Sequence, residues 1–316
     1  MTDARRAAAA LLACVAGLTL VSCGDEEAAT EVVPAASGAS IDGEQSEVQL
    51  PHGRLTFEVT DAEEVTEDDA PDAGTSGRFV GVDWTWEPGA GVPPLVSGFL
   101  LADDVEAAVR VQVDGTWHDL GPAYDTAEGG AAGTAFFVPA GDDVTAGDVR
   151  LAVDFDGVEQ TVQGDGSGLE AGAAAAMYEL TGEPVEPECP VALQPQGVAG
   201  EATCTAAFVE LPYVTGLGWA ATGTTWIVAD LSVTATGLSV AGQDQPIVEQ
   251  TETATLDGVE PASVLLDEAS GAAQRTQSVY AGEPGAERRL SFTRNLSSSQ
   301  RAVVAKATGE VVVPAA

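Results

Sequence analysis

The sequence predicts an all-β protein with two tandem antiparallel β-sandwich domains. Short runs of alternating apolar and polar residues recur along most of the 316-residue chain, which is the pattern of strands with one buried face. Asp-Gly dipeptides at 114–115 and 156–157 supply the positive φ angles of tight hairpin turns. Helical patterns of ten or more residues, which parallel α/β folds place between strands, are missing from the sequence. The length favours two domains over one.

The N-terminus has the features of an export signal. Arg5 and Arg6 precede the uncharged run Ala7–Leu20, which is shorter than the roughly 20 apolar residues of a membrane-spanning helix and fits the apolar region of a signal peptide. The run ends in Leu20-Val21-Ser22-Cys23, which resembles the lipobox of bacterial lipoproteins. The resemblance implies cleavage before Cys23 and a diacylglycerol on its thiol, and two acyl chains hold a protein stably on a bilayer. A plain signal peptide with a chance cysteine is the alternative.

Composition divides the rest of the chain. A stretch rich in Glu, Ala, Ser and Gly, without apolar periodicity, predicts a disordered tether. A glycine-rich run, an alanine-rich run that predicts a short helix, and three closely spaced prolines mark a boundary between the domains. The predicted parts are a signal peptide (1–22), the lipidated cysteine with its acidic tether (23–45), a first sandwich (46–163), a linker (164–188) and a second sandwich (189–316).

Several segments of the first domain predict strands. Residues 54–60 place Leu55, Phe57 and Val59 on one face. Two hairpins follow, each joined by an Asp-Gly turn: residues 109–113 with 116–118, and residues 149–155 with 158–162.

The tryptophans are the natural candidates for ligand contact. On strand 78–86, Trp84 and Trp86 share a parity with two valines, which predicts that they lie in the core; if they faced solvent, they would form a platform for a sugar or an aromatic ligand. Trp219 lies in the glycine-rich segment 216–220. It is the better candidate for exposure, and we take it as the tentative binding residue.

The second half repeats features of the first half in the same order, which indicates an internal duplication. Chance similarity between short strands is the alternative. The matching segments are 79–86 with 226–233, 138–142 with 279–283, and 150–153 with 289–292.

These features have a counterpart in known proteins. A glycine turn leads into an apolar strand with a central aspartate, Asp83 or Asp230, and an Ala-Gly-acid turn later precedes a closing strand. Behind a lipobox and a polar tether, this layout is similar to the immunoglobulin-like, telokin-like domains of Gram-positive (actinobacterial) surface lipoproteins and of a secreted mycobacterial immunogen. The resemblance covers residues 46–163 and 189–314. It implies an Ig-like sandwich that binds or displays, and it brings no catalytic residues.

Charge excludes some partners. The chain has 50 acidic and 12 basic residues, and residues 24–168 alone have 31 acidic and 4 basic ones. Nucleic-acid binding requires clustered Lys and Arg, so no nucleic-acid partner is expected, and the protein body should not lie on an anionic membrane. The charge serves solubility or attracts cations or basic partners.

Two cysteines remain after Cys23. An extracytoplasmic compartment is oxidising enough to pair Cys189 with Cys204, and a loop of that size contributes about 3 kcal/mol in the chain-entropy model. Two cysteines without a nearby histidine do not make a zinc site. We therefore predict a disulfide, and neither a metal nor a cofactor.

No catalytic motif stands out. His52 and His118 are expected at the surface, and the sequence has no nucleophile elbow, P-loop, dinucleotide fingerprint or zinc-protease motif. Carboxylate pairs are too numerous to be informative. An acidic loop could bind calcium through hard oxygen ligands, although a solvated charge run is the simpler interpretation. Its residues are Glu63, Glu64, Glu67, Asp68, Asp69 and Asp72.

The resulting expectation is a non-enzymatic protein held by the Cys23 lipid on the extracytoplasmic face of the cell membrane. It would bind or display there, with an unidentified envelope protein or ligand as partner. Two alternatives stay open: an envelope enzyme that uses carboxylates, for example on carbohydrate, and a solute-capture lipoprotein. A solute-capture protein usually has two α/β lobes around a cleft, which the helix-poor pattern disfavours.

Overall fold

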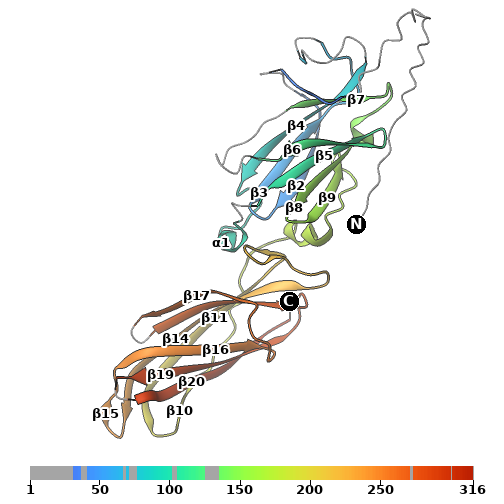
Figure 1. The fold of residues 1–316 in the computed structure, drawn as a ribbon. Coiled ribbons are helices and arrows are strands. Elements are labelled where there is room, and N and C mark those ends of the chain that lie inside the picture. The colour runs from blue at the N-terminus through green and yellow to red at the C-terminus, as the bar shows by residue number, and fades with distance from the viewer. Residues whose placement is uncertain are drawn as a thin grey trace, which may run out of the picture.

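The computed structural model describes residues 31–36, 41–66, 69–70, 77–101, 105–124, 135–270, 273–299 and 301–315. These residues are almost entirely β with antiparallel sheets, which confirms the predicted all-β sandwich class. The two sandwiches lie end to end, with the short helix α1 (Ser97–Leu100) at their junction (Figure 1). No helix among these residues is long and apolar enough to cross a membrane. The predicted signal peptide and Cys23 lie outside the described residues.

Two sheets of described strands form the first sandwich. The strand order of the first sheet is β1 (Val33–Pro34), β7 (Phe136–Ala140), β4 (Arg78–Pro88), β3 (Gly53–Val59) and β2 (Glu44–Leu50). The strand order of the second sheet is β6 (Thr116–Pro122), β5 (Ala107–Val113), β8 (Arg150–Phe155) and β9 (Val158–Gln163). Leu55, Phe57 and Val59 are fully buried, because alternate residues of a strand face the core. Trp84 and Trp86 are only 1% and 5% exposed, so both belong to the core, as predicted.

Both predicted hairpins are present. Asp114 and Gly115 have φ angles of 50° and 77° between β5 and β6, and Asp156 and Gly157 have 50° and 76° between β8 and β9. Positive φ at both central residues matches the right-handed twist of the flanking strands. A short 3₁₀ helix, η1 (Ala146–Asp148), precedes β8 and is capped by Thr145 and Asp148.

Described strands of the second half form the second sandwich. The strand order of one sheet is β10 (Val191–Gln194), β20 (Arg301–Val313), β19 (Arg288–Ser298) and β16 (Ile247–Leu256). The strand order of the other is β11 (Val198–Leu211), β14 (Thr225–Val240), β18 (Ala273–Gly282) and β17 (Ser263–Ser270), and β15 (Gln243–Asp244) pairs with β14. A separate hairpin, β12 (Tyr213–Val214) and β13 (Gly218–Trp219), projects toward the first sandwich.

The prediction of a disordered tether over residues 23–45 is wrong for the described residues of that range, 31–36 and 41–45. Strand β1 pairs with β7, and β2 begins at Glu44 inside the expected tether. Val33 and Ile41 are buried against Phe79 and Phe137. Isolated apolar residues have no periodicity, so the sequence alone did not reveal that they cover this end of the sandwich.

The segment between the sandwiches is packed on both of them. Glu170 forms a bridge with Thr161 of β9, and the predicted short helix is the 3₁₀ helix η2 (Gly172–Met177), which buries Met177. Further along, Val185 exchanges two backbone hydrogen bonds with Phe208 of β11.

The segments that match in sequence occupy equivalent strands. Strand β4 lies between β3 and β7, and β14 lies between β11 and β18. The register differs by one residue, because Val80 faces Val138 whereas the equivalent Ile227 faces Tyr280 instead of Val279.

Candidate functional site

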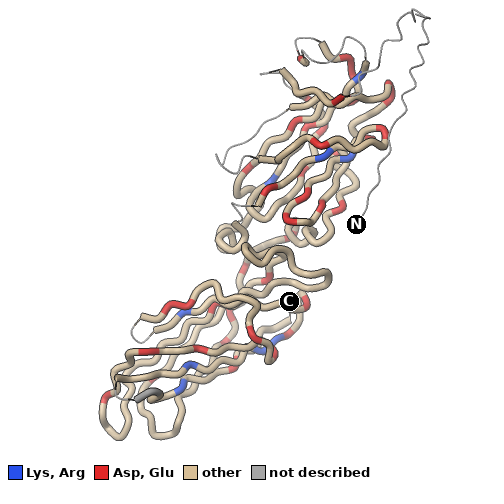
Figure 2. Tube along the Cα trace, in the orientation of Figure 1, with Lys and Arg blue, Asp and Glu red and all other residues tan. Residues whose placement is uncertain are grey.

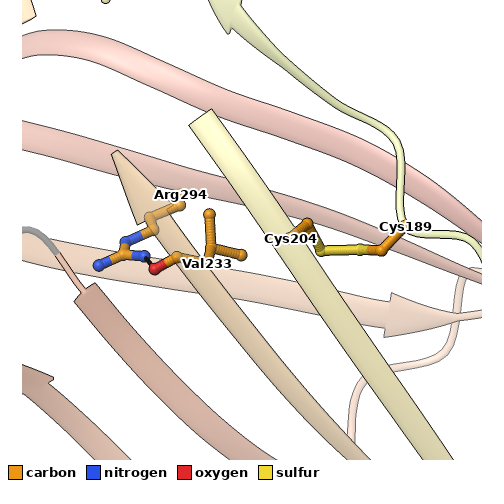
Figure 3. Close-up of a disulfide and its surroundings, with 4 residues drawn as sticks. All are labelled: Cys189, Cys204, Val233 and Arg294. Carbon is orange, nitrogen blue, oxygen red and sulfur yellow. Dashed lines mark hydrogen bonds between the residues drawn. A yellow bond between two sulfur atoms is a disulfide. The ribbon is translucent and has the colours of Figure 1, made fainter. Parts of the chain in front are cut away.

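The predicted disulfide closes one edge of the second sandwich. Cys189, just before β10, is bonded to Cys204 on β11, and their Cα atoms are 5.3 Å apart. Strands β10 and β11 belong to different sheets, so the bond ties the two sheets together (Figure 3). Apolar residues of both sheets pack around it.

The opposite side of the same core is polar. Alternate residues of β18 face the interior, and Gln274, Thr276 and Ser278 are buried there. From the facing sheet, Glu252 accepts a hydrogen bond of 2.5 Å from the Thr276 hydroxyl. Arg294 is fully buried beside Glu252, its neighbour in the β16–β19 pair. We call Glu252, Gln274, Thr276 and Arg294 the polar core cluster.

Backbone and side-chain oxygens hold the buried guanidinium. Arg294 donates to the Val233 carbonyl and to Gln250 Oε1. Val233 on β14 faces Cys204 of β11 on one side and Gln274 of β18 on the other. Figure 3 shows Arg294 and the disulfide on opposite sides of Val233.

Burial shifts the ionisation of these groups. Desolvation lowers the pKa of Arg294 to about 10, although Glu252 and Asp267 oppose the shift. Desolvation also raises the pKa of the Glu252 carboxyl against the hydrogen bond from Thr276, and it raises the pKa of Tyr280 to about 12. Shifted pKa values often mark active sites, but structural ion clusters produce them too.

Two cavities are formed by other residues. One, of about 510 Å³, lies at the end of β2 and β3 beside Asp42, Glu58 and Asp61. The other, of about 940 Å³, lies at the sandwich junction, and its wall includes the buried Arg288, which donates to Glu210. No member of the polar core cluster lines either cavity. The cluster is therefore a hydrogen-bonded polar part of the core that lies apart from both cavities.

Trp219 lies at the junction of the sandwiches. Its indole Nε1 donates to the Phe155 carbonyl at 2.8 Å, and its ring packs edge-on against Phe155 and Tyr213. The next contact along the hairpin is the Thr215 amide, which donates to the Phe99 carbonyl at 2.8 Å. Trp219 is therefore half-buried between the two sandwiches; it is more exposed than Trp84 and Trp86, as expected, but it is not a fully exposed residue.

The exposed tryptophan is Trp117. All five tryptophans belong to the described residues, and of these Trp117 alone is exposed, with 37% of its surface accessible. It faces Gln112 across the β5–β6 hairpin. Parity could have identified it: the Asp-Gly turn pairs Trp117 with Gln112, whose neighbours Val111 and Val113 point into the core.

His52 is also placed differently from the prediction. Its ring packs 4.9 Å from Trp86, 5.2 Å from Tyr124 and 5.4 Å from Phe155. The turn after Pro51 places His52 near the sandwich junction, where these rings gather, and its side chain is half-buried. His118 is half-buried opposite Val111.

The acidic loop is described only in part, since Glu67, Asp68 and Asp72 lie outside the described residues. Glu63 forms a bridge with Phe79, and the Thr66 hydroxyl donates to Asp69 at 2.6 Å. Within the described ranges, no group of three or more His, Cys, Asp or Glu residues is placed to hold a metal ion.

Comparison with known proteins adds no functional assignment: no protein-family model matches the sequence, and no curated protein is significantly similar to it.

Proposed function

We propose that the chain is a lipid-anchored protein of the extracytoplasmic membrane face, whose two sandwiches bind or display without catalysing a reaction. The observation that carries the non-catalytic part is the location of the shifted ionisable groups in the core of the second sandwich. Tyr280 and Arg294 are buried inside the second sandwich and Glu252 is half-buried beside Arg294. None of the three lines either cavity, so they are poorly placed to contact a substrate.

The sequence supports the anchor. The lipobox-like segment Leu20–Cys23 and the short apolar run before it fit a lipoprotein signal. Within the same proposal, the two sandwiches are Ig-like domains of the telokin-like kind, arranged in tandem. The repeated strand order around β4 and β14 is consistent with that assignment.

Metabolic labelling with a fatty acid and detergent phase partitioning test the anchor. The full chain should take up label and enter the detergent phase, because two acyl chains bind a bilayer stably. Cys23→Ser should be unlabelled and stay in the aqueous phase. Cys14→Ser is the matched control, because Cys14 lies in the segment that is removed, and it should behave like the unmodified chain.

Detergent partitioning of Cys23→Ser together with retained label would show that the anchor assignment is wrong. For the binding role, the measurement is affinity capture from envelope extract with the full chain as bait. Turnover of an envelope substrate by the purified protein would contradict the non-catalytic part.

A further inference from the structure

We propose that the outer face of the sheet β6–β5–β8–β9 binds a neutral glycan chain. This inference rests on the binding role proposed above and names its ligand class. We define the glycan face by the outward residues of this sheet that carry the argument: Arg110, Gln112, Trp117, Arg150, Glu159 and Gln163.

Strand register places four of these side chains in one row. Trp117 faces Gln112, Gln112 faces Arg150, and Arg150 faces Gln163. Directly opposed residues of antiparallel strands point to the same side of the sheet. Neighbouring strands are about 4.8 Å apart, so the row crosses the sheet and is long enough for a short oligosaccharide.

The aromatic ring in this row is held in place. Arg110 lies over the Trp117 ring with its guanidinium carbon 5.0 Å from the ring centroid, and Glu159 forms an ion pair with Arg110. A cation over an indole ring is attracted to it. The ring is therefore both exposed and oriented, and little conformational entropy is lost when a ligand stacks on it.

The chemistry of the face matches a sugar ring. One side of a pyranose ring presents C–H groups that pack on an indole, while its hydroxyl groups need donors and acceptors around them. Gln112 donates to the Gly115 carbonyl and offers its amide oxygen, and Gln163 accepts from the Ser167 hydroxyl and offers its amide N–H groups. Arg150 offers N–H donors beyond those it directs to Thr161 and Glu170.

The charges favour a neutral chain. Arg110 and Arg150 are each paired with a carboxylate, Glu159 and Glu170, so the face offers no uncompensated positive charge. Acidic positions are spread over both sandwiches, with few basic ones between them (Figure 2). A polyanion would be repelled by this field, whereas a hydroxyl-rich polymer would not.

Affinity electrophoresis of the full chain in mild detergent tests the proposal. The gels contain soluble starch, hydroxyethyl cellulose, galactomannan or, as the acidic comparison, polygalacturonate. At least one neutral polysaccharide should retard the protein. Trp117→Ala should weaken that affinity by about tenfold or more, as truncation of an aromatic contact residue does. Gln112→Ala should also weaken it, although this variant keeps the Trp117 ring.

Leu95→Ala is the control, because Leu95 is the most exposed large apolar residue on the loop before α1 and lies off the glycan face; it should leave retardation unchanged. Circular dichroism confirms that each variant is folded. Retardation by none of the three neutral polymers, retardation by polygalacturonate alone, or retardation that survives both face substitutions would overturn the proposal. The lipid plays no part in this assay. A negative result here therefore says nothing against the lipid anchor, and a negative result in the labelling test says nothing against glycan binding.

Discussion

At the scale of single residues, the second sandwich holds one buried guanidinium on neutral oxygen acceptors, with a half-buried carboxylate beside it. The Arg294 guanidinium donates to the Val233 carbonyl and to Gln250, and Glu252 lies beside it. The negative charge of Glu252 favours the charged form of Arg294 through space. The raised pKa of Glu252 nevertheless shows that ionisation of this carboxyl is harder in the folded protein than in the unfolded chain.

Glu252→Gln should therefore change the pH dependence of stability. Below the unfolded pKa of about 4.5, Glu252 is protonated in both states and contributes no pH dependence. As the pH rises above that value, the unfolded chain releases the proton first, so the stability of the unmodified protein falls through the window up to the raised pKa. The glutamine amide of the variant would stay neutral and still accept from Thr276. The melting temperature of the variant relative to the unmodified protein should rise between pH 4 and pH 7.

The exposed Glu260 provides the control for this comparison. Glu260→Gln removes the same charge from the surface, so its melting temperature relative to the unmodified protein should change much less over the same range. A relative melting temperature of Glu252→Gln that falls with rising pH would contradict the linkage argument.

At the scale of elements, turn chemistry was readable from the sequence and long-range pairing was not. Asp114-Gly115 identified its hairpin because few residues adopt positive φ. Strand β1 escaped detection, since Val33 is buried by packing against residues of later strands, such as Phe79 and Phe137. The glycan face was missed for a related reason: Trp117 and Arg150 come to lie on either side of Gln112 only through strand register.

Gly115→Ala should destabilise the first sandwich by about 1–2 kcal/mol, because a side chain at positive φ is strained in the left-handed region. A methyl group at Gly115 meets no atom within 4 Å, so φ alone, at 77°, is responsible. Gly98 in α1 has the same open surroundings without a positive φ, and Gly98→Ala should be neutral or slightly stabilising. Urea unfolding measures both. If both substitutions changed the free energy of unfolding equally, the positive φ at Gly115 would not be the cause of the loss.

At the scale of the whole molecule, the junction decides whether the sandwiches unfold together. Phe155 at the end of β8 is contacted by Tyr213 and Trp219 of the second half, and buried residues from both sandwiches form one continuous apolar cluster. The sequence suggested a linker here, because Pro and Gly are frequent at domain boundaries. It could not show that the hairpin β12–β13 would dock on the first sandwich, since that contact depends on where two distant elements end.

Trp219→Ala should uncouple the two sandwiches. The substitution removes the hydrogen bond to the Phe155 carbonyl and two aromatic contacts, together worth about 2 kcal/mol, so calorimetry should resolve two transitions further apart than in the unmodified protein. A reductant identifies the second of them, because opening Cys189–Cys204 lowers the melting temperature of the second sandwich alone. Trp117→Ala removes the same side chain at a site remote from the junction and should leave the spacing of the transitions unchanged. Superimposable profiles for Trp219→Ala and the unmodified protein would show that the junction carries no coupling.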